Sequence, residues 1–127
     1  MSEPSGGDGT GAPGIRVLIV DDDRDIRETL GELLSEDGFA VEAAWNGETA
    51  LNRLEAGFRP DVIILDLMMP VMDGLTFREL QRKHPVLANI PVVGLTAAPI
   101  PDVDFECLRK PLSFDVLVDK LHRAVRR

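Results

Sequence analysis

The stretch "VLIVDDDRD", residues 17–25, joins four apolar residues directly to a cluster of acidic ones. An unbroken apolar run is typical of a parallel strand that is buried on both faces. The carboxylates of Asp21, Asp22 and Asp23 repel one another, and burying them unpaired is costly. Either water solvates these side chains, or a positively charged group binds among them.

The composition limits the classes of protein to which the chain can belong. Its 127 residues are 44% hydrophobic, enough for one domain with a real core. The formal net charge of −8 argues against nucleic acid or an anionic membrane as the main partner. The single cysteine, Cys107, excludes an internal disulfide and fits a reducing, cytoplasmic compartment. No apolar run approaches the ~20 residues of a membrane helix.

The first fourteen residues differ in composition from the rest. The segment 1–14, "MSEPSGGDGTGAPG", is rich in Gly, Ser and Pro and has no apolar stretch. This predicts a disordered N-terminal tail rather than a signal peptide. We therefore expect one domain, residues 15–127, with no output domain after its last helix.

Beyond the tail, short apolar runs alternate with segments of helical periodicity. Strands that alternate with helices indicate an α/β fold, in which helices cover both faces of a parallel sheet. We expect the flavodoxin-like, doubly wound arrangement of five strands in the order 2-1-3-4-5. The predicted strands are 15–20, 39–44, 61–66, 90–96 and 105–109.

Helices are expected between and after these strands. They cover 24–36, the segment between Asn46 and Gly57, 74–83, and the segment that Pro111 opens. The residues expected on buried faces are Ile26, Leu30, Leu33 and Leu34 in the first, Leu75 and Leu80 in the third, and Phe114, Leu117, Val118, Leu121 and Val125 in the last.

Polar side chains gather at the carboxyl ends of the predicted strands. Asp21 and Asp22 follow the first strand and Asp66 ends the third, its neighbour, so the three carboxylates meet where the strand order reverses. Oxygen ligands with room left for water suit Mg²⁺. Thr96 and Lys110 end the fourth and fifth strands and add a hydroxyl and an ammonium. With a metal, they would bind a phosphoryl group and stabilise the charge that develops as it transfers to an aspartate.

Four pieces of the sequence match one known family in order and spacing: "VLIVDDD", "VIILDLMMPVMDG", "VVGLTAA" and "LRKPL". From Ile15 onward the chain resembles the receiver domain of two-component response regulators, of the stand-alone, single-domain type. The resemblance implies that Asp66 is the phosphoacceptor. It also implies that Asp21, Asp22 and Asp66 bind Mg²⁺ together with the backbone carbonyl of Met68.

The same resemblance implies further roles and partners. Thr96 would contact the phosphoryl group and move on activation, and Lys110 would pair first with the acidic site and then with the phosphate. Pro111 would follow Lys110 through a cis peptide bond. The donor would be a histidine kinase or a phosphotransfer protein, and an unidentified downstream protein would receive the signal. Such a phosphoprotein catalyses its own phosphorylation and dephosphorylation and is not a turnover enzyme on an external substrate.

One segment departs from this family. Only thirteen residues separate Thr96 from Lys110, fewer than in typical receivers by about one short helix and its loop. If the fifth strand forms as predicted, residues 97–104 make the whole crossover, whereas a crossover with a helix usually needs at least ~10–12 residues. Pro99 and Pro101 also oppose a helix in this segment. We therefore expect the usual fourth helix to be missing.

Alternatives to a phosphorylated receiver follow from this departure. Cys107 occupies the position of an aromatic residue whose rotation reports phosphorylation in the family. The lost helix and the lost aromatic favour a pseudo-receiver, a phosphorylation-independent protein-binding module, whereas the complete set of site residues favours phosphorylation. A hydrolase is disfavoured because no separate general base is visible. A calcium-binding EF-hand loop that starts at Asp21 is rejected because Ile26 stands where the sharp turn requires glycine.

Overall fold

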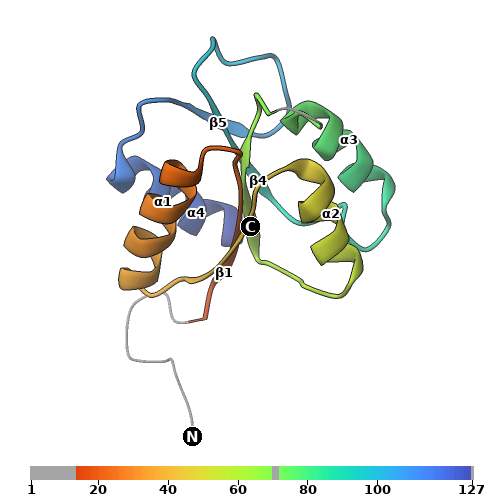
Figure 1. Ribbon diagram of the computed structural model, residues 1–127, viewed down its shortest axis with the longest axis horizontal. Helices are drawn as coiled ribbons and strands as arrows, with labels where there is room; N and C mark the ends of the chain where they lie inside the picture. The colour runs from red at the N-terminus through yellow and green to blue at the C-terminus, as the bar shows by residue number, and fades with distance from the viewer. Residues whose placement is uncertain (1–13, 70–71, 127) are drawn as a thin grey trace, which may run out of the picture.

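The computed structural model describes residues 14–69 and 72–126, and the statements below concern these residues. Five strands form one parallel sheet in the order β2-β1-β3-β4-β5, which confirms the predicted flavodoxin-like α/β topology. Figure 1 shows the sheet between two layers of helices. The strands are β1 (Arg16–Val20), β2 (Ala40–Ala44), β3 (Val62–Asp66), β4 (Val92–Thr96) and β5 (Glu106–Arg109). The helices are α1 (Arg24–Glu36), α2 (Gly47–Glu55), α3 (Gly74–Lys83) and α4 (Phe114–Val125).

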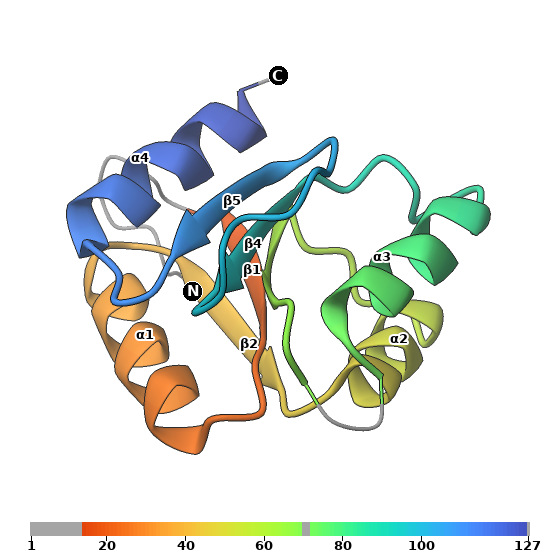
Figure 2. The same cartoon turned by 90° about the horizontal axis from the view of Figure 1, so that it is seen from above.

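The sheet is covered on both faces, with α1 and α4 on one side and α2 and α3 on the other (Figure 2). Successive strand residues point to opposite faces, so Ile63 packs in the core under α2 and α3, and Ile64 packs in the core under α1 and α4. β3 is therefore buried along its whole length, as its apolar sequence predicts. Asp66 is the polar residue at its end.

The helix that follows the acidic cluster begins where the sequence predicts. The Asp23 side chain is the N-cap of α1 and accepts hydrogen bonds from the N–H groups of Asp25 and Ile26. Asn46 and Asp73 cap α2 and α3 in the same way. Each cap fixes the path of a chain segment that leaves the carboxyl edge of the sheet.

The last helix begins later than predicted. Ser113 is its N-cap, and the Ser113 hydroxyl accepts a hydrogen bond of 3.4 Å from the N–H of Val116. α4 therefore begins at Phe114, and the prediction that Pro111 opens it is wrong. The peptide bond between Lys110 and Pro111 is cis, as the resemblance implied.

The buried face of α3 also differs from the prediction. Leu75 and Leu80 were expected inward, but they are 44% and 40% exposed. Phe77 and Gln81 are buried in their place. Gln81 tolerates burial because its amide nitrogen donates two hydrogen bonds of 2.9 Å to backbone carbonyls of the loop before β4.

In α1 the predicted apolar face is divided between two environments. Leu30 and Leu34 are buried in the core. Ile26 is half-buried, and Leu33 is 38% exposed. Part of the predicted apolar face of α1 is therefore exposed.

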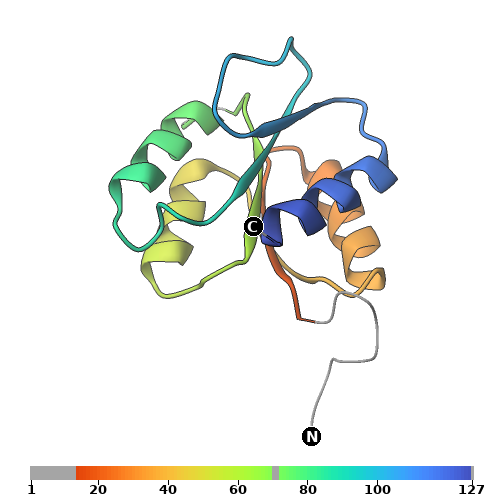
Figure 3. The ribbon, with the colours of Figure 1, turned by 180° about the vertical axis from the view of Figure 1, so that it is seen from behind.

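Residues 97–104 connect β4 to β5 without a helix, as predicted. Figure 3 shows this crossover as a loop that rises beyond the ends of the strands. Side chains attach it to α3: Arg82 forms an ion pair of 3.5 Å with Asp104, and the guanidinium of Arg78 lies 5.5 Å from the centre of the Phe105 ring. The crossover is thus held by individual contacts rather than by a packed helix.

The predicted tail, residues 1–14, lies outside the described residues apart from Gly14. Within residues 14–69 and 72–126, no helix has the length and apolar character needed to cross a membrane.

Candidate metal centre

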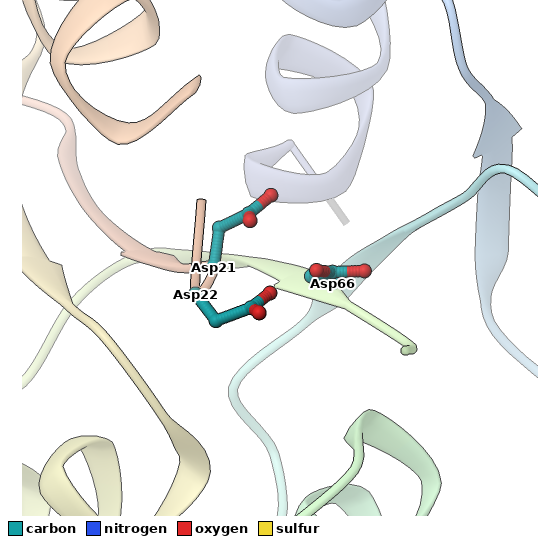
Figure 4. A group of neighbouring side chains, drawn as sticks. All are labelled: Asp21, Asp22 and Asp66. Atoms are coloured by element: carbon teal, nitrogen blue, oxygen red, sulfur yellow. The ribbon is translucent and has the colours of Figure 1, made fainter. Parts of the chain in front are cut away.

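Three carboxylates from two neighbouring strands meet at the carboxyl edge of the sheet. β1 and β3 pair with Val20 opposite Leu65, so the residues that follow, Asp21 and Asp66, lie side by side. One carboxylate oxygen from each of Asp21, Asp22 and Asp66 lies within 4.8 Å of the others. Figure 4 shows the three side chains converging on one space. Register therefore explains why the acidic residues at the ends of these two strands, Asp21 and Asp66, lie together.

The backbone around this cluster is closely packed. Asp21 is fully buried and Asp66 is 3% exposed, whereas Asp22 is exposed. The Asp21 carboxylate accepts a hydrogen bond of 2.9 Å from the N–H of Asp23. On the other side, a Cβ atom at Gly74 would lie 2.6 Å from the backbone oxygen of Asp66. Glycine at this position lets α3 start directly against the end of β3.

Lys110 supplies positive charge beside the carboxylates. Its Nζ lies 3.5 Å from Asp21 Oδ2 and 3.8 Å from Asp66 Oδ1. The backbone N–H of Lys110 donates a hydrogen bond of 2.8 Å to the carbonyl of Thr96, which fixes its position at the end of β5. One ammonium offsets only part of the charge of three carboxylates, so a further cation would reduce the repulsion among them.

The electrostatic surroundings raise the pKa of Asp66 from its ordinary value of 3.8 to about 7. Burial, which disfavours the charged carboxylate, is the largest cause. The N–H of Met68, which donates a hydrogen bond of 3.1 Å to Asp66 Oδ1, lowers the pKa, and Lys110 lowers it less. The neighbouring Asp21 and Asp22 raise it. A divalent cation in the cluster would favour the charged carboxylate instead.

The other predicted site residues, Thr96 and Met68, lie at the same edge of the sheet. Thr96 is 2% exposed at the end of β4, and its hydroxyl accepts a hydrogen bond of 3.0 Å from the N–H of Ala98. Asp66 pairs with Leu95 in the sheet, which places Thr96 one residue further along. Met68 contacts Asp66 through its N–H, and the predicted role of its carbonyl remains a prediction.

The donor set suits a small hard cation. Carboxylate oxygens are preferred ligands of Mg²⁺, which commonly keeps several waters and takes one or two protein carboxylates. The separation of up to 4.8 Å between the three oxygens matches one ion held by some of them directly and by others through water. The residues present therefore fit a magnesium site.

One residue at this site had no role in the sequence analysis. Arg27, on the first turns of α1, donates a hydrogen bond of 2.8 Å from Nη1 to the backbone carbonyl of Asp21. The sequence does not predict this contact, because an arginine that donates to a backbone carbonyl requires no particular residue type as its partner. What the sequence does show is the spacing of six residues, which lets the first turn of α1 bring the Arg27 side chain back to Asp21.

Comparisons with known proteins agree with this geometry. The family model for the response regulator receiver domain matches residues 17–122, and the chain therefore belongs to that family. Receiver domains of response regulators accept phosphate from histidine kinases in two-component signalling. Response regulator MprA of Mycolicibacterium vanbaalenii is 37% identical over 122 residues, which cover 89% of this chain and 51% of that protein. The chain thus spans about half the length of the curated relatives it matches.

Solved structures share the fold. The receiver domain of Francisella response regulator 1452 is 30% identical, with a TM-score of 0.79 over 88% of this chain and 97% of that chain. Response regulator TrrA from Thermotoga maritima, solved in complex with Mg²⁺ and BeF, is 35% identical. Its TM-score is 0.76, over 86% of this chain and 97% of that chain.

Proposed function

We propose that this chain is a phosphorylation-dependent signalling switch in which Asp66 accepts a phosphoryl group from a histidine kinase or a phosphotransfer protein. One observation carries the proposal: Asp66 is buried at the carboxyl end of β3, within reach of two further carboxylates and of Lys110. A buried carboxylate beside a cation site and an ammonium is the arrangement that phosphoryl transfer to an aspartate requires.

The transfer proceeds by in-line displacement. A carboxylate oxygen of Asp66 attacks the phosphorus of the donor's phosphohistidine, and an O–P bond forms as the P–N bond breaks. The electron pair of that bond stays on the imidazole nitrogen, which takes up a proton from solvent. The product is an aspartyl phosphate and a free histidine.

The residues around Asp66 have separate roles in this step. Asp21, Asp22 and Asp66, with the backbone carbonyl of Met68, would hold Mg²⁺, which supplies positive charge to the phosphoryl oxygens when bound. Lys110, which pairs with Asp21 and Asp66 before transfer, donates a hydrogen bond to a phosphoryl oxygen once Asp66 carries the phosphoryl group. The buried Thr96 hydroxyl exchanges its contact with the chain that follows β4 for one with the phosphate.

A groove beside the site suits a protein donor. It has a volume of about 400 Å³, lies between α1 and the segment that leads into α4, and is mainly apolar. Ile26 and Leu33 line one side, Leu112 and Phe114 line the other, and Lys110 links the groove to the acidic cluster. A protein that packs apolar side chains here would bring its phosphohistidine to Asp66. No nucleic acid or membrane enters this role, and a cytoplasmic location fits it.

A second function is favoured by the β4–β5 side of the molecule. The missing helix and Cys107 in place of the family's aromatic residue are expected of a pseudo-receiver that binds proteins without phosphorylation. The two functions differ in one observable, which is whether Asp66 is ever phosphorylated.

Incubation with acetyl phosphate and Mg²⁺, followed by intact-mass measurement, separates the two. Wild type should gain the mass of one phosphoryl group, and Asp66→Asn or omission of Mg²⁺ should abolish the gain. Asp61→Asn, an equal charge change near the opposite end of β3, is the matched control and should be phosphorylated like wild type. Folded wild-type protein that gains no mass in Mg²⁺ would favour the pseudo-receiver.

A further inference from the structure

We propose that Arg27 is a positioning residue for the metal centre, because it fixes the peptide group between Asp21 and Asp22 and so directs the Asp22 carboxylate toward Asp66. The inference rests on the proposed function, since it concerns how that same site binds its cation. Its starting point is the hydrogen bond of 2.8 Å from Arg27 Nη1 to the backbone carbonyl of Asp21.

Covalent geometry transmits this contact to the neighbouring residue. The carbonyl of Asp21 and the N–H of Asp22 belong to one planar peptide group. An arginine that holds the oxygen therefore holds the whole plane from which Asp22 departs. Asp22 is exposed, so packing does little to fix its side chain, and the direction of its backbone matters correspondingly more.

Asp21 itself is held at every polar group. Its N–H donates to the carbonyl of Ala44 at 3.2 Å, and its Oδ1 accepts from the N–H of Asp23 at 2.9 Å. Its Oδ2 lies 3.5 Å from Lys110 Nζ. Arg27 completes the set at the carbonyl, on the side that leads to Asp22. Its hydrogen bond fixes the orientation of the carbonyl itself.

The arginine reaches the turn from a rigid support. Its backbone N–H donates a hydrogen bond of 3.0 Å to the carbonyl of Asp23, the N-cap of α1. The Arg27 side chain, α1 and its N-cap residue Asp23 thus enclose the segment that carries the carboxylates of Asp21 and Asp22. A hydrogen bond from a charged donor is roughly twice as strong as a neutral one, so this contact resists displacement.

Charge and geometry predict opposite results when Arg27 is replaced. A guanidinium beside the cluster repels Mg²⁺, so its removal would strengthen Mg²⁺ binding if its charge were all that mattered. If Arg27 positions Asp22, its removal weakens Mg²⁺ binding despite the loss of repulsion. The sign of the change therefore decides between the two.

The test is calorimetric titration of the full chain with MgCl₂ at constant ionic strength, with Trp45 fluorescence as a second readout. Arg27→Met should raise the Kd for Mg²⁺ about tenfold, as is usual when a residue that orients metal ligands is lost. Arg24→Met is the matched control. It removes the same charge from the same helix, where the side chain is 78% exposed and pairs with Glu28, and it should leave the Kd unchanged or slightly lower.

An unchanged or lower Kd in Arg27→Met would overturn the proposal, even if thermal unfolding in EDTA showed a less stable protein. A purely structural role lowers stability without changing the affinity of the folded state. If Arg27→Met does not fold, Arg27→Gln decides, since its amide keeps the side chain polar but ends two atoms short of the Nη1 that donates to the Asp21 carbonyl. Weaker Mg²⁺ binding then supports the proposal, and equal binding overturns it.

Failure of the two proposals can be told apart. Wild type that binds no Mg²⁺ would contradict both the metal site and the role of Arg27. Wild type that binds Mg²⁺ more tightly than Arg27→Met, but is not phosphorylated by acetyl phosphate, would leave the role of Arg27 intact and contradict the proposed function.

Discussion

Two regions share the carboxyl edge of the sheet, and they are held in different ways. At the ends of β1 and β3, strand register and a helix cap place the carboxylates of Asp21 and Asp66. At the ends of β4 and β5, residues 97–104 form no helix and are attached to α3 through contacts such as the ion pair of Arg82 with Asp104. The comparison teaches that strand register brings the carboxylates of Asp21 and Asp66 together, whereas the β4–β5 crossover depends on individual side-chain contacts with α3.

The two regions meet at a glycine. A Cβ atom at Gly94 would lie 3.0 Å from Cys107 Sγ, 3.0 Å from a ring carbon of Phe105 and 3.3 Å from a methyl group of Leu67. Leu67 directly follows Asp66 in the sequence. The space left by the missing side chain at Gly94 therefore lets Leu67, Phe105 and Cys107 pack close to one another.

The largest expected effect is on the pH dependence of stability in EDTA. Because the folded state holds a proton on Asp66 up to about pH 7, while the unfolded state releases it near pH 4, stability falls as pH rises through this window. Asp66→Asn should remove this loss of stability. The free energy of unfolding of the variant should therefore exceed that of wild type by an amount that grows with pH to at most about 4 kcal/mol. Urea unfolding at a series of pH values measures it. A difference in free energy of unfolding that does not change with pH would contradict the raised pKa of Asp66.

Magnesium should reverse that destabilisation. A ligand that binds only the folded state stabilises it by about 2.7 kcal/mol at a hundredfold excess over its Kd. Asp22→Asn should lose most of this gain, because it removes one carboxylate of the cluster. Asp25→Asn, the same change on the exposed first turn of α1, should keep it. Thermal unfolding in MgCl₂ against NaCl of matched ionic strength tests this, and equal responses of both variants would contradict the metal site.

Truncation of Phe105 should lower the stability of the protein without affecting the acidic cluster of Asp21, Asp22 and Asp66. Its half-buried ring packs over Gly94 and under Arg78, so Phe105→Ala should cost about 2 kcal/mol, less than a fully buried phenylalanine. Ile100→Ala, at a half-exposed crossover position, should cost under ~0.5 kcal/mol. Urea unfolding measures both costs. If Phe105→Ala also slowed phosphorylation by acetyl phosphate, the two regions would not be separable.

The smallest effect concerns the exposed ion pair between Arg82 and Asp104. Both side chains are more than half exposed, so a double-mutant cycle should give a coupling of about 0.2–1 kcal/mol that falls with added salt. The pair of Arg123 with Asp119 on α4, of similar exposure, is a matched reference within one helix. A coupling well above that reference would show that the crossover is attached more firmly than its exposure indicates.

The sequence was sufficient where one local pattern determined the structure. The apolar run that ends in Asp66 predicted both a fully buried strand and a carboxylate at its end. The shortness of 97–104 and its two prolines predicted a crossover without a helix. In both cases chain geometry alone excluded the alternatives.

The sequence failed where a partner distant in the chain decided the outcome. Leu80 was expected on the buried face of α3, but Gln81 is buried instead, because carbonyls of the loop before β4 accept hydrogen bonds from its amide. Arg27 received no role because its partner is a backbone carbonyl. Ser113 was not predicted as the N-cap of α4, because proline is common at the first position of a helix and Pro111 comes two residues earlier.

The most direct test of the account is amide hydrogen exchange with Mg²⁺, with and without BeF₃⁻, which mimics the phosphoryl group on an aspartate. If phosphorylation of Asp66 is read out through the helix-free crossover, protection should increase mainly at 67–69 and 96–104. Asp66→Asn should show no increase. Protection changes confined to α4, or none at 96–104 despite bound BeF₃⁻, would contradict the account.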